Sequence, residues 1–180
     1  MVDGVPRVTR LTGMHLLAGT SGFSYKEWKG SFYPKDLPDK DRLRFYAERL
    51  PAVEINNTFY RMPRPELFER WTTEVPEQFV FVIKASQRIT HRARLNDVGD
   101  AMGYLWHASQ SLGARRGPIL FQLPPSFRKD LERLESFLAE LPDDCHAVFE
   151  LRHPSWAEDD VHALLRARGA ALCVAGRRAA

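Results

Sequence analysis

The sequence predicts an α/β protein: a parallel (β/α) barrel built from about six strand–helix units. Three observations support this fold class. Six short apolar runs recur along the 180 residues, segments with helical periodicity lie between them, and the polar residues of the runs keep to one parity. Strands that alternate with helices favour a parallel sheet joined by right-handed crossovers. A single polar parity favours a barrel over an open sheet.

The six apolar runs are rich in Val, Ile, Leu and Phe and are bounded by Gly, Pro or polar residues, as buried strands are. We predict one strand at each of residues 15–19, 52–56, 80–86, 118–123, 146–151 and 171–175.

Apolar residues three and four positions apart predict helices between these strands. The apolar faces run from Leu43 to Leu50, from Val98 to Ser109 and from Leu131 to Leu141, and a shorter one surrounds Leu67, Phe68 and Trp71.

Several helix ends are also marked in the sequence. Pro65 is a favoured first-turn residue, and Ser155 with Glu158 is the pattern of a capping box. Gly113 and Gly169 follow predicted helices, where a left-handed conformation is common.

The parity of the polar residues separates the two main parallel architectures. A doubly wound sheet carries helices on both faces, so its central strands are apolar at both parities. Here one parity is apolar throughout, and the other becomes polar toward the C-terminal end of each strand. Its polar members are Glu54, Asn56, Lys84, Ser86, Gln122, Glu150 and Arg152. The segment GTSGFSY after the first strand is also not a GxGxxG dinucleotide turn. We therefore expect these side chains to converge inside a barrel, at its C-terminal mouth.

The chain is predicted to form one barrel-like domain over residues 14–180, because no linker or low-complexity tract divides it. Residues 1–13 show no strand or helix period and are predicted to be an irregular N-terminal extension. No apolar run approaches the roughly 20 residues of a membrane span, and the N-terminus lacks the features of a signal peptide. Cys145 and Cys173 sit in or beside apolar runs and are interpreted as small hydrophobes. We expect a cytoplasmic protein.

The composition is that of a globular protein, with 44% hydrophobic and 27% charged residues. The net charge of +3 permits an anionic ligand or nucleic acid as a partner but does not require one.

Glu54 and Glu150 are the candidate acid–base pair, because two carboxylates in a partly desolvated pocket can take different pKa values. The alternative interpretation is that each neutralises a cation, with Lys84 and Arg152 as partners. Lys84 is also a candidate catalytic residue, and with Arg152 it could instead hold a phosphate or carboxylate.

Four further polar side chains are predicted to orient a ligand at the mouth, namely Asn56, Ser86, His91 and Gln122. The histidines follow no metal-binding spacing such as HExxH, so no metal site is assigned. The sequence does not identify a cofactor.

Large aromatic side chains crowd the loop after the first strand and the ends of other strands. Tyr25, Trp28, Tyr60 and Trp156 are candidates for stacking a base or a sugar. Alternatively, the rings close the mouth as a hydrophobic cluster.

Five segments of the chain resemble the domain-of-unknown-function family 72, whose members are also called YecE-like proteins. They are residues 19–34, 53–63, 81–91, 112–127 and 149–156, in the family's order. The resemblance implies a TIM-type barrel of unestablished activity. Members of the family look longer, so the barrel is expected to lack its last units. A truncated product, an oligomer joined through open sheet edges, and irregular packing of residues 170–180 are the three explanations left open.

Two functions remain open from the sequence. The first is an enzyme that acts on a polar or anionic, phosphate-containing ligand at the mouth. The second is a binding protein without catalysis, for nucleic acid or another phosphorylated ligand, and a third possibility is an inactive truncated form. No membrane partner is expected.

Overall fold

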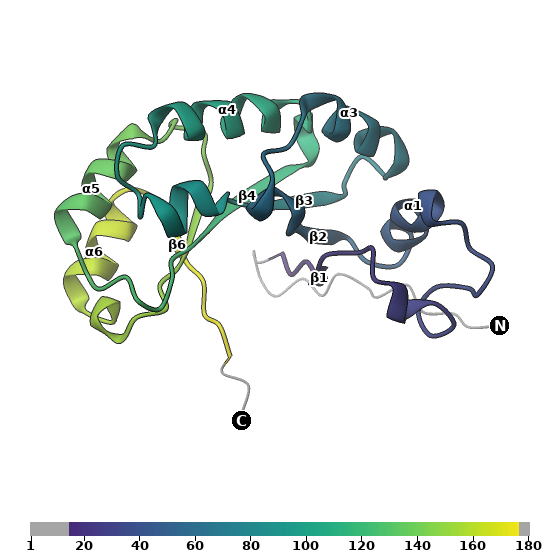
Figure 1. The fold of residues 1–180 in the computed structure, drawn as a ribbon, viewed down its shortest axis with the longest axis horizontal. Helices are drawn as coiled ribbons and strands as arrows, with labels where there is room; N and C mark the ends of the chain where they lie inside the picture. The colour runs from purple at the N-terminus through teal and green to yellow at the C-terminus, as the bar shows by residue number, and fades with distance from the viewer. Residues whose placement is uncertain (1–14, 177–180) are drawn as a thin grey trace.

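The structure is a computed structural model that describes residues 15–176. Its centre is a six-stranded parallel sheet in which each strand pairs with the next along the chain. The strands are β1 (Gly19–Ser21), β2 (Ala52–Ile55), β3 (Val80–Lys84), β4 (Arg116–Gln122), β5 (Ala147–Glu150) and β6 (Ala171–Leu172). The predicted α/β fold with six strand–helix units is confirmed. Within the described residues β1 and β6 do not pair with each other, so the sheet curves but does not close (Figure 1).

The helices follow the strands and cover the convex, outer face of the sheet (Figure 1). The α-helices are α1 (Arg42–Ala47), α2 (Asn57–Tyr60), α3 (Pro65–Glu74), α4 (Gly99–Gln110), α5 (Leu131–Glu140) and α6 (Asp159–Ala167). Short 3-10 turns lie at η1 (Lys26–Trp28), η2 (Asp39–Asp41), η4 (Gly113–Arg115) and η5 (Pro154–Trp156), and a π-helical turn forms η3 (Arg88–Arg92).

The hydrophobic core lies between the outer face of the sheet and these helices. Val53, Phe81 and Phe149 on the outer face are fully buried, and so are Phe68 of α3 and Leu105 of α4. Burial of one such side chain contributes about 1.5–3 kcal/mol to folding. The apolar parity predicted from the sequence is therefore the parity that holds the helices.

The opposite parity forms a concave inner face that stays half-buried. Glu54, Lys84, Gln122 and Glu150 lie on it near the C-terminal ends of four neighbouring strands. A parallel sheet brings those ends to one edge, so the fold gathers the polar side chains without any contribution from the helices.

The two outer strands differ from the prediction. A strand was expected at 15–19, but β1 begins at Gly19, because pairing with β2 starts with Gly19 opposite Ala52. Leu16 and Leu17 precede the strand and are 64% and 43% exposed. At the other edge β6 spans only Ala171–Leu172 instead of residues 171–175.

The helix signals have mixed outcomes. Pro65 is the first residue of α3, and Gly113 and Gly169 have φ angles of +54° and +64°. The capping box predicted from Ser155 and Glu158 is wrong: Glu158 is the N-cap of α6 but makes no side-chain capping bond. The hydroxyl of Ser155 instead accepts a hydrogen bond from the backbone N–H of residue 129.

Two remaining expectations concern whole segments. The irregular extension predicted at residues 1–13 lies outside the described residues. Among residues 15–176, none of the helices has the length and hydropathy that crossing a bilayer requires.

Candidate functional site

The mouth is defined here as the inner-face side chains at and just after the C-terminal ends of the strands, together with the loops that face them. Its first group joins β1 to β2. Ser21 lies opposite Glu54 in the strand register, and its Oγ donates a hydrogen bond of 2.7 Å to Glu54 Oε1. Asn56 Nδ2 donates to Ser21 Oγ at 2.6 Å. The Glu54 carboxylate is thus held by a chain of uncharged donors, with no cation within ion-pair distance among residues 15–176.

The second group joins β4 to β5. Gln122 lies opposite Glu150, and its Nε2 donates to Glu150 Oε2 at 2.6 Å. Arg152 Nε lies 3.6 Å from Glu150 Oε1. Glu150 therefore has the cationic neighbour that the ion-pair interpretation requires, whereas Glu54 does not.

Lys84 lies between the two groups, at the end of β3. Its Nζ is 5.1 Å from the centroid of the Phe59 ring, and the His91 ring meets the same phenyl ring edge-on at 4.9 Å. Lys84 is half-buried, and it forms no ion pair within residues 15–176. A half-buried ammonium group without a carboxylate partner is available to an anionic ligand.

The pKa of His91 depends on the charged groups around its ring. It lies in the π-helical turn that follows β3, and its Nδ1 is 2.9 Å from Thr90 Oγ1. Partial burial lowers the pKa of His91, the cations of Lys84 and Arg152 lower it further, and the carboxylate of Glu150 opposes them. The charges of three predicted site residues, Lys84, Glu150 and Arg152, thus act on the His91 imidazole.

Glu54 and Glu150 both affect the pKa of Cys173. It follows Leu172, which pairs with Phe149, so it lies on the inner face beside Glu150, and its N–H donates to the Phe149 carbonyl at 2.8 Å. Burial raises the pKa of Cys173, and the charges of Glu150 and Glu54 raise it further. Cys173 is therefore close enough to both carboxylates for their charges to act on its thiol.

Ser86 and Trp156 lie behind the mouth rather than on its surface. Ser86 is 2% exposed, and its Oγ accepts a hydrogen bond from the backbone N–H of Arg88 at the start of η3. Trp156 is 1% exposed, and its Nε1 donates to the Phe127 carbonyl at 2.7 Å. Both residues shape the wall of the mouth and have little surface for a ligand.

The aromatic residues divide into packed and exposed rings. Trp28 is half-buried and packs edge-on against Phe32 at 5.5 Å, as part of a cluster that continues to α1. Tyr25 and Tyr60 remain 39% and 73% exposed, and the hydroxyl of Tyr25 donates to the Ser21 carbonyl. The cluster interpretation accounts for Trp28, while Tyr25 and Tyr60 keep free ring surface.

Ser21 belongs to this site but was not singled out from the sequence, whereas Cys173 was interpreted only as a small hydrophobe and Phe59 only as one of the large aromatic residues at strand ends. Ser21 fell outside the expected first strand, so its parity could not be read. Cys173 fell inside the last predicted run, where alternation from Ala171 places it on the inner parity. Phe59 lies in the short helix α2, and no pattern in the sequence showed that its ring would face Lys84.

The arrangement supplies carboxylates, amides and cations at one opening but no clustered metal ligands. Within residues 15–176, no three His, Cys, Asp or Glu side chains come together as a metal site would require. The chemistry that these groups offer is anion binding by Lys84 and Arg152, and proton transfer by Glu54, Glu150 or His91.

Comparison with known proteins identifies relatives over most of the chain. A model of the family described as "Protein of unknown function DUF72" matches residues 17–179. The UPF0759 protein YecE of Escherichia coli (strain K12) is 33% identical over 115 residues, which are 63% of this chain and 42% of that protein. The UPF0759 protein YunF of Bacillus subtilis (strain 168) is 28% identical over 134 residues, 70% of this chain and 48% of that protein. The chain thus spans less than half the length of these curated relatives.

Solved structures show the same fold. A DUF72 family protein from Thermotoga maritima superposes with a TM-score of 0.77 at 29% identity, over 87% of this chain and 63% of that one. A DUF72 family protein from Enterococcus faecalis gives a TM-score of 0.71 at 22% identity, over 86% of this chain and 58% of that one. These structures are TIM-barrel-like, and the six units described above correspond to part of such a barrel.

Proposed function

The chain belongs to the DUF72 family, and from that premise we propose that its mouth binds a small anionic, phosphate-containing ligand on which the protein acts as an enzyme. The ligand lies on the inner face between the Ser21–Glu54–Asn56 group and the Gln122–Glu150–Arg152 group.

The main support for this proposal is the position of Lys84. It stands on a central strand, half-buried, with a phenyl ring beneath its ammonium group and no carboxylate within ion-pair distance in residues 15–176. A cation in such a position loses part of its hydration without gaining a counter-ion. An anion that binds next to it would supply that counter-ion, and this favours anion binding. Arg152 adds a second cation whose contact with Glu150 is loose, at 3.6 Å.

Glu54 and Glu150 are the groups that move protons in this proposal. Each accepts a hydrogen bond from an uncharged neighbour, Ser21 or Gln122, which fixes one carboxylate oxygen, and the second oxygen of Glu150 faces Arg152. Their surroundings differ, because Arg152 Nε lies 3.6 Å from Glu150 and Glu54 has no ion-pair partner within residues 15–176.

A second candidate function is the binding of single-stranded nucleic acid without catalysis. The exposed rings of Tyr25 and Tyr60 favour it, because sequence-tolerant stacking of bases needs free aromatic faces beside cations. Salt-dependent affinity for a single-stranded oligonucleotide, lost in Tyr25→Ala or Tyr60→Ala and kept in Glu54→Gln, would support this function over the first.

The first function is tested by thermal unfolding in the presence of inorganic phosphate. We expect the melting temperature of the wild-type chain to rise with phosphate concentration, because a ligand that binds only the folded state stabilises it. Lys84→Met is expected to remove most of that rise.

Lys40→Met is the matched control, since Lys40 is exposed on η2 and its replacement changes the net charge equally. Equal phosphate responses in the wild type and both variants would refute the proposed anion site. We further propose that the protein works in the cytoplasm, since Cys145 and Cys173 are both unpaired thiols, as is usual in a reducing compartment.

A further inference from the structure

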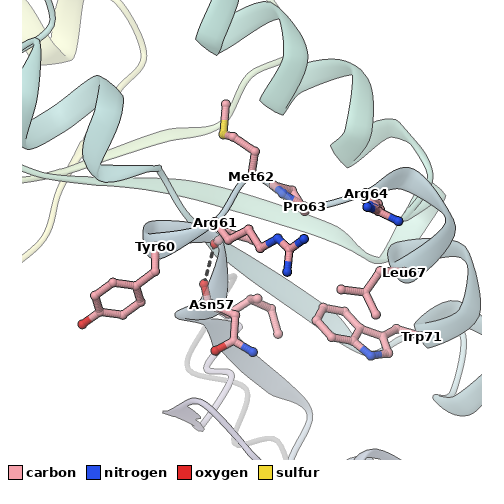
Figure 2. A pocket seen from close by; sticks show the side chains of 10 residues that line it. Asn57, Tyr60, Arg61, Met62, Pro63, Arg64, Leu67 and Trp71 are labelled. Carbon is pink, nitrogen blue, oxygen red and sulfur yellow. Dashed lines mark hydrogen bonds between the residues drawn. The ribbon is translucent and has the colours of Figure 1, made fainter.

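A second cavity lies outside the mouth, between α2, the segment that follows it and α3 (Figure 2). Its volume is about 530 Å³. Small-molecule sites typically enclose roughly 300–1,000 Å³. The residues that matter for its chemistry are Ile55, Leu67 and Trp71 along the floor and Arg61 and Arg64 at the edge.

The floor is apolar and fixed in place by the core. Trp71 is 8% exposed and stacks on Phe81 of β3, with the ring centroids 6.0 Å apart and the planes 18° from parallel. Ile55 is 3% exposed and belongs to β2. Trp71 and Ile55 therefore form a rigid apolar wall that exposes only a small area to the cavity, and a ligand need not order these side chains.

The edge carries two positive charges without compensation. Neither Arg61 nor Arg64 forms an ion pair within residues 15–176, and the lining of the cavity includes no Asp or Glu. The edge of this cavity is therefore a local excess of positive charge.

The side chains that line this cavity also point in directions that suit a ligand site. Figure 2 shows the Arg61 guanidinium extended toward Leu67 and Trp71, while the Tyr60 ring turns away from them. The backbone N–H of Arg61 donates to the Asn57 carbonyl at 3.0 Å, which holds the start of this segment against α2.

We propose that this cavity binds a small organic anion with a flat apolar body. The body lies against Leu67 and Trp71, and a carboxylate or phosphate group is held by Arg61 and Arg64, whose planar guanidinium groups suit either acid. This site is separate from the phosphate-binding mouth and uses none of its charged residues.

Isothermal titration calorimetry tests this proposal with three probes of the same body: 1-naphthoate, 1-naphthyl phosphate and the neutral 1-naphthamide. We expect saturable binding of the two anions, and the stronger of the two identifies the acid that the site prefers. The double variant Arg61→Met/Arg64→Met is expected to weaken both anions at least about tenfold and to leave the amide within about threefold.

The double variant Arg44→Met/Arg128→Met controls for net charge, because both residues are exposed and unpaired among residues 15–176. It should bind like the wild type, as should Lys84→Met, whose altered residue is in the mouth. Leu67→Asp should bind neither anion, with circular dichroism confirming that it folds.

The proposal is overturned if neither anion saturates, or if Arg61→Met/Arg64→Met binds both as tightly as the control does. It is also overturned if Lys84→Met, rather than the arginine variant, removes binding of 1-naphthyl phosphate. Because the phosphate response of the mouth is measured with different variants, failure of one site does not imply failure of the other.

Discussion

At the scale of residues, the mouth is built from pairs that face each other across neighbouring strands. Parallel neighbours lie about 4.8 Å apart, so side chains at matched register positions are within hydrogen-bonding reach. Ser21 meets Glu54 in this way, and Gln122 meets Glu150. Each carboxylate is satisfied by an uncharged partner, and this leaves the charge of Lys84 uncompensated between the two pairs.

The convergence of Glu54 and Glu150 can be tested through Cys173. Both carboxylates raise the pKa of this thiol beyond the effect of burial. Glu150→Gln and Glu54→Gln are each expected to lower the pKa of Cys173 and to increase its rate of reaction with a disulfide reagent at pH 8, because the thiolate is the reactive form. Stopped-flow absorbance measures the rate.

Cys145 provides the internal reference for that measurement. Burial raises its pKa to about 11, so it should remain slow in every variant. Glu132→Gln, a charge change on the outer helix α5, should leave the rate of Cys173 unaltered. An unchanged rate in Glu54→Gln would mean that Glu54 does not face the same opening as Glu150.

At the scale of elements, the junction of β3 and β4 is the irregular part of the sheet. Phe81 pairs with Arg116 and Ile83 with Ile119, so two residues of β4 oppose the single residue Val82 of β3. Gly117 and Pro118 occupy this bulge. Pro118 is tolerated there because a bulged position does not need its missing N–H. The bulge sets the register from which Lys84 and Gln122 both reach the inner face.

Gly117 is required at this bulge by steric contact. A Cβ at position 117 would lie 2.5 Å from Val80 Cγ1 and 2.8 Å from the Phe81 carbonyl oxygen. Gly117→Ala is therefore expected to lower the free energy of unfolding by about 1–3 kcal/mol, measured by urea denaturation.

Gly103→Ala is the matched control, since position 103 is exposed in α4 and a Cβ there meets nothing within 4 Å. It should stabilise the protein by about 0.5–1 kcal/mol, because alanine loses less backbone entropy in a helix. Equal stability of the two variants would exclude the steric role of Gly117.

The central elements could be predicted from the sequence, and the outer ones could not. β2, β3 and β5 alternate apolar and polar residues because helices cover one face, and that burial is recorded in the pattern. β1 was misplaced because Leu16 and Leu17 have the composition of a strand but pair with no other strand within residues 15–176. The π-helical turn at 88–92 left no periodic signal, so the position of His91 beside Lys84 required the structure.

The candidate site at the mouth was likewise only partly predictable from the sequence. Parity placed Glu54, Lys84, Gln122 and Glu150 on one face without knowledge of any distance. It could not reveal which residues are covered by loops, so Ser86 and Trp156 were expected at the surface but lie inside. Nor could it reveal the cavity beside α3, because that cavity is formed by a loop and a helix whose residues share no period.

At the scale of the whole molecule, the sheet has two edges. Within residues 15–176, β1 and β6 each pair with one neighbour only. Apolar side chains stay exposed beside both edges: Leu16 and Leu17 near β1, and Leu172 and Val174, at 42% and 88% exposure, near β6. Unpaired strand edges with exposed apolar side chains are sites where another chain can add.

We propose that copies of this chain associate through these edges. Sedimentation velocity is expected to show a concentration-dependent dimer for the wild type. The double variant Leu172→Lys/Val174→Lys should be monomeric over the same range, because lysine on an edge strand opposes pairing.

Tyr104→Lys serves as the control, since it removes an equally exposed apolar side chain from α4, far from either edge in the sheet order. It should sediment like the wild type. A monomeric wild type at every concentration up to about 100 µM would contradict the proposal; such association typically involves interfaces of standard size.

The division of the strands into two parities has one more consequence. The side chains that hold the helices and those that meet a ligand alternate along the same strands but never share a face. Replacements at the polar positions should thus alter what the protein recognises while barely affecting how firmly it folds. A family with this layout is free to diversify its chemistry on a constant scaffold.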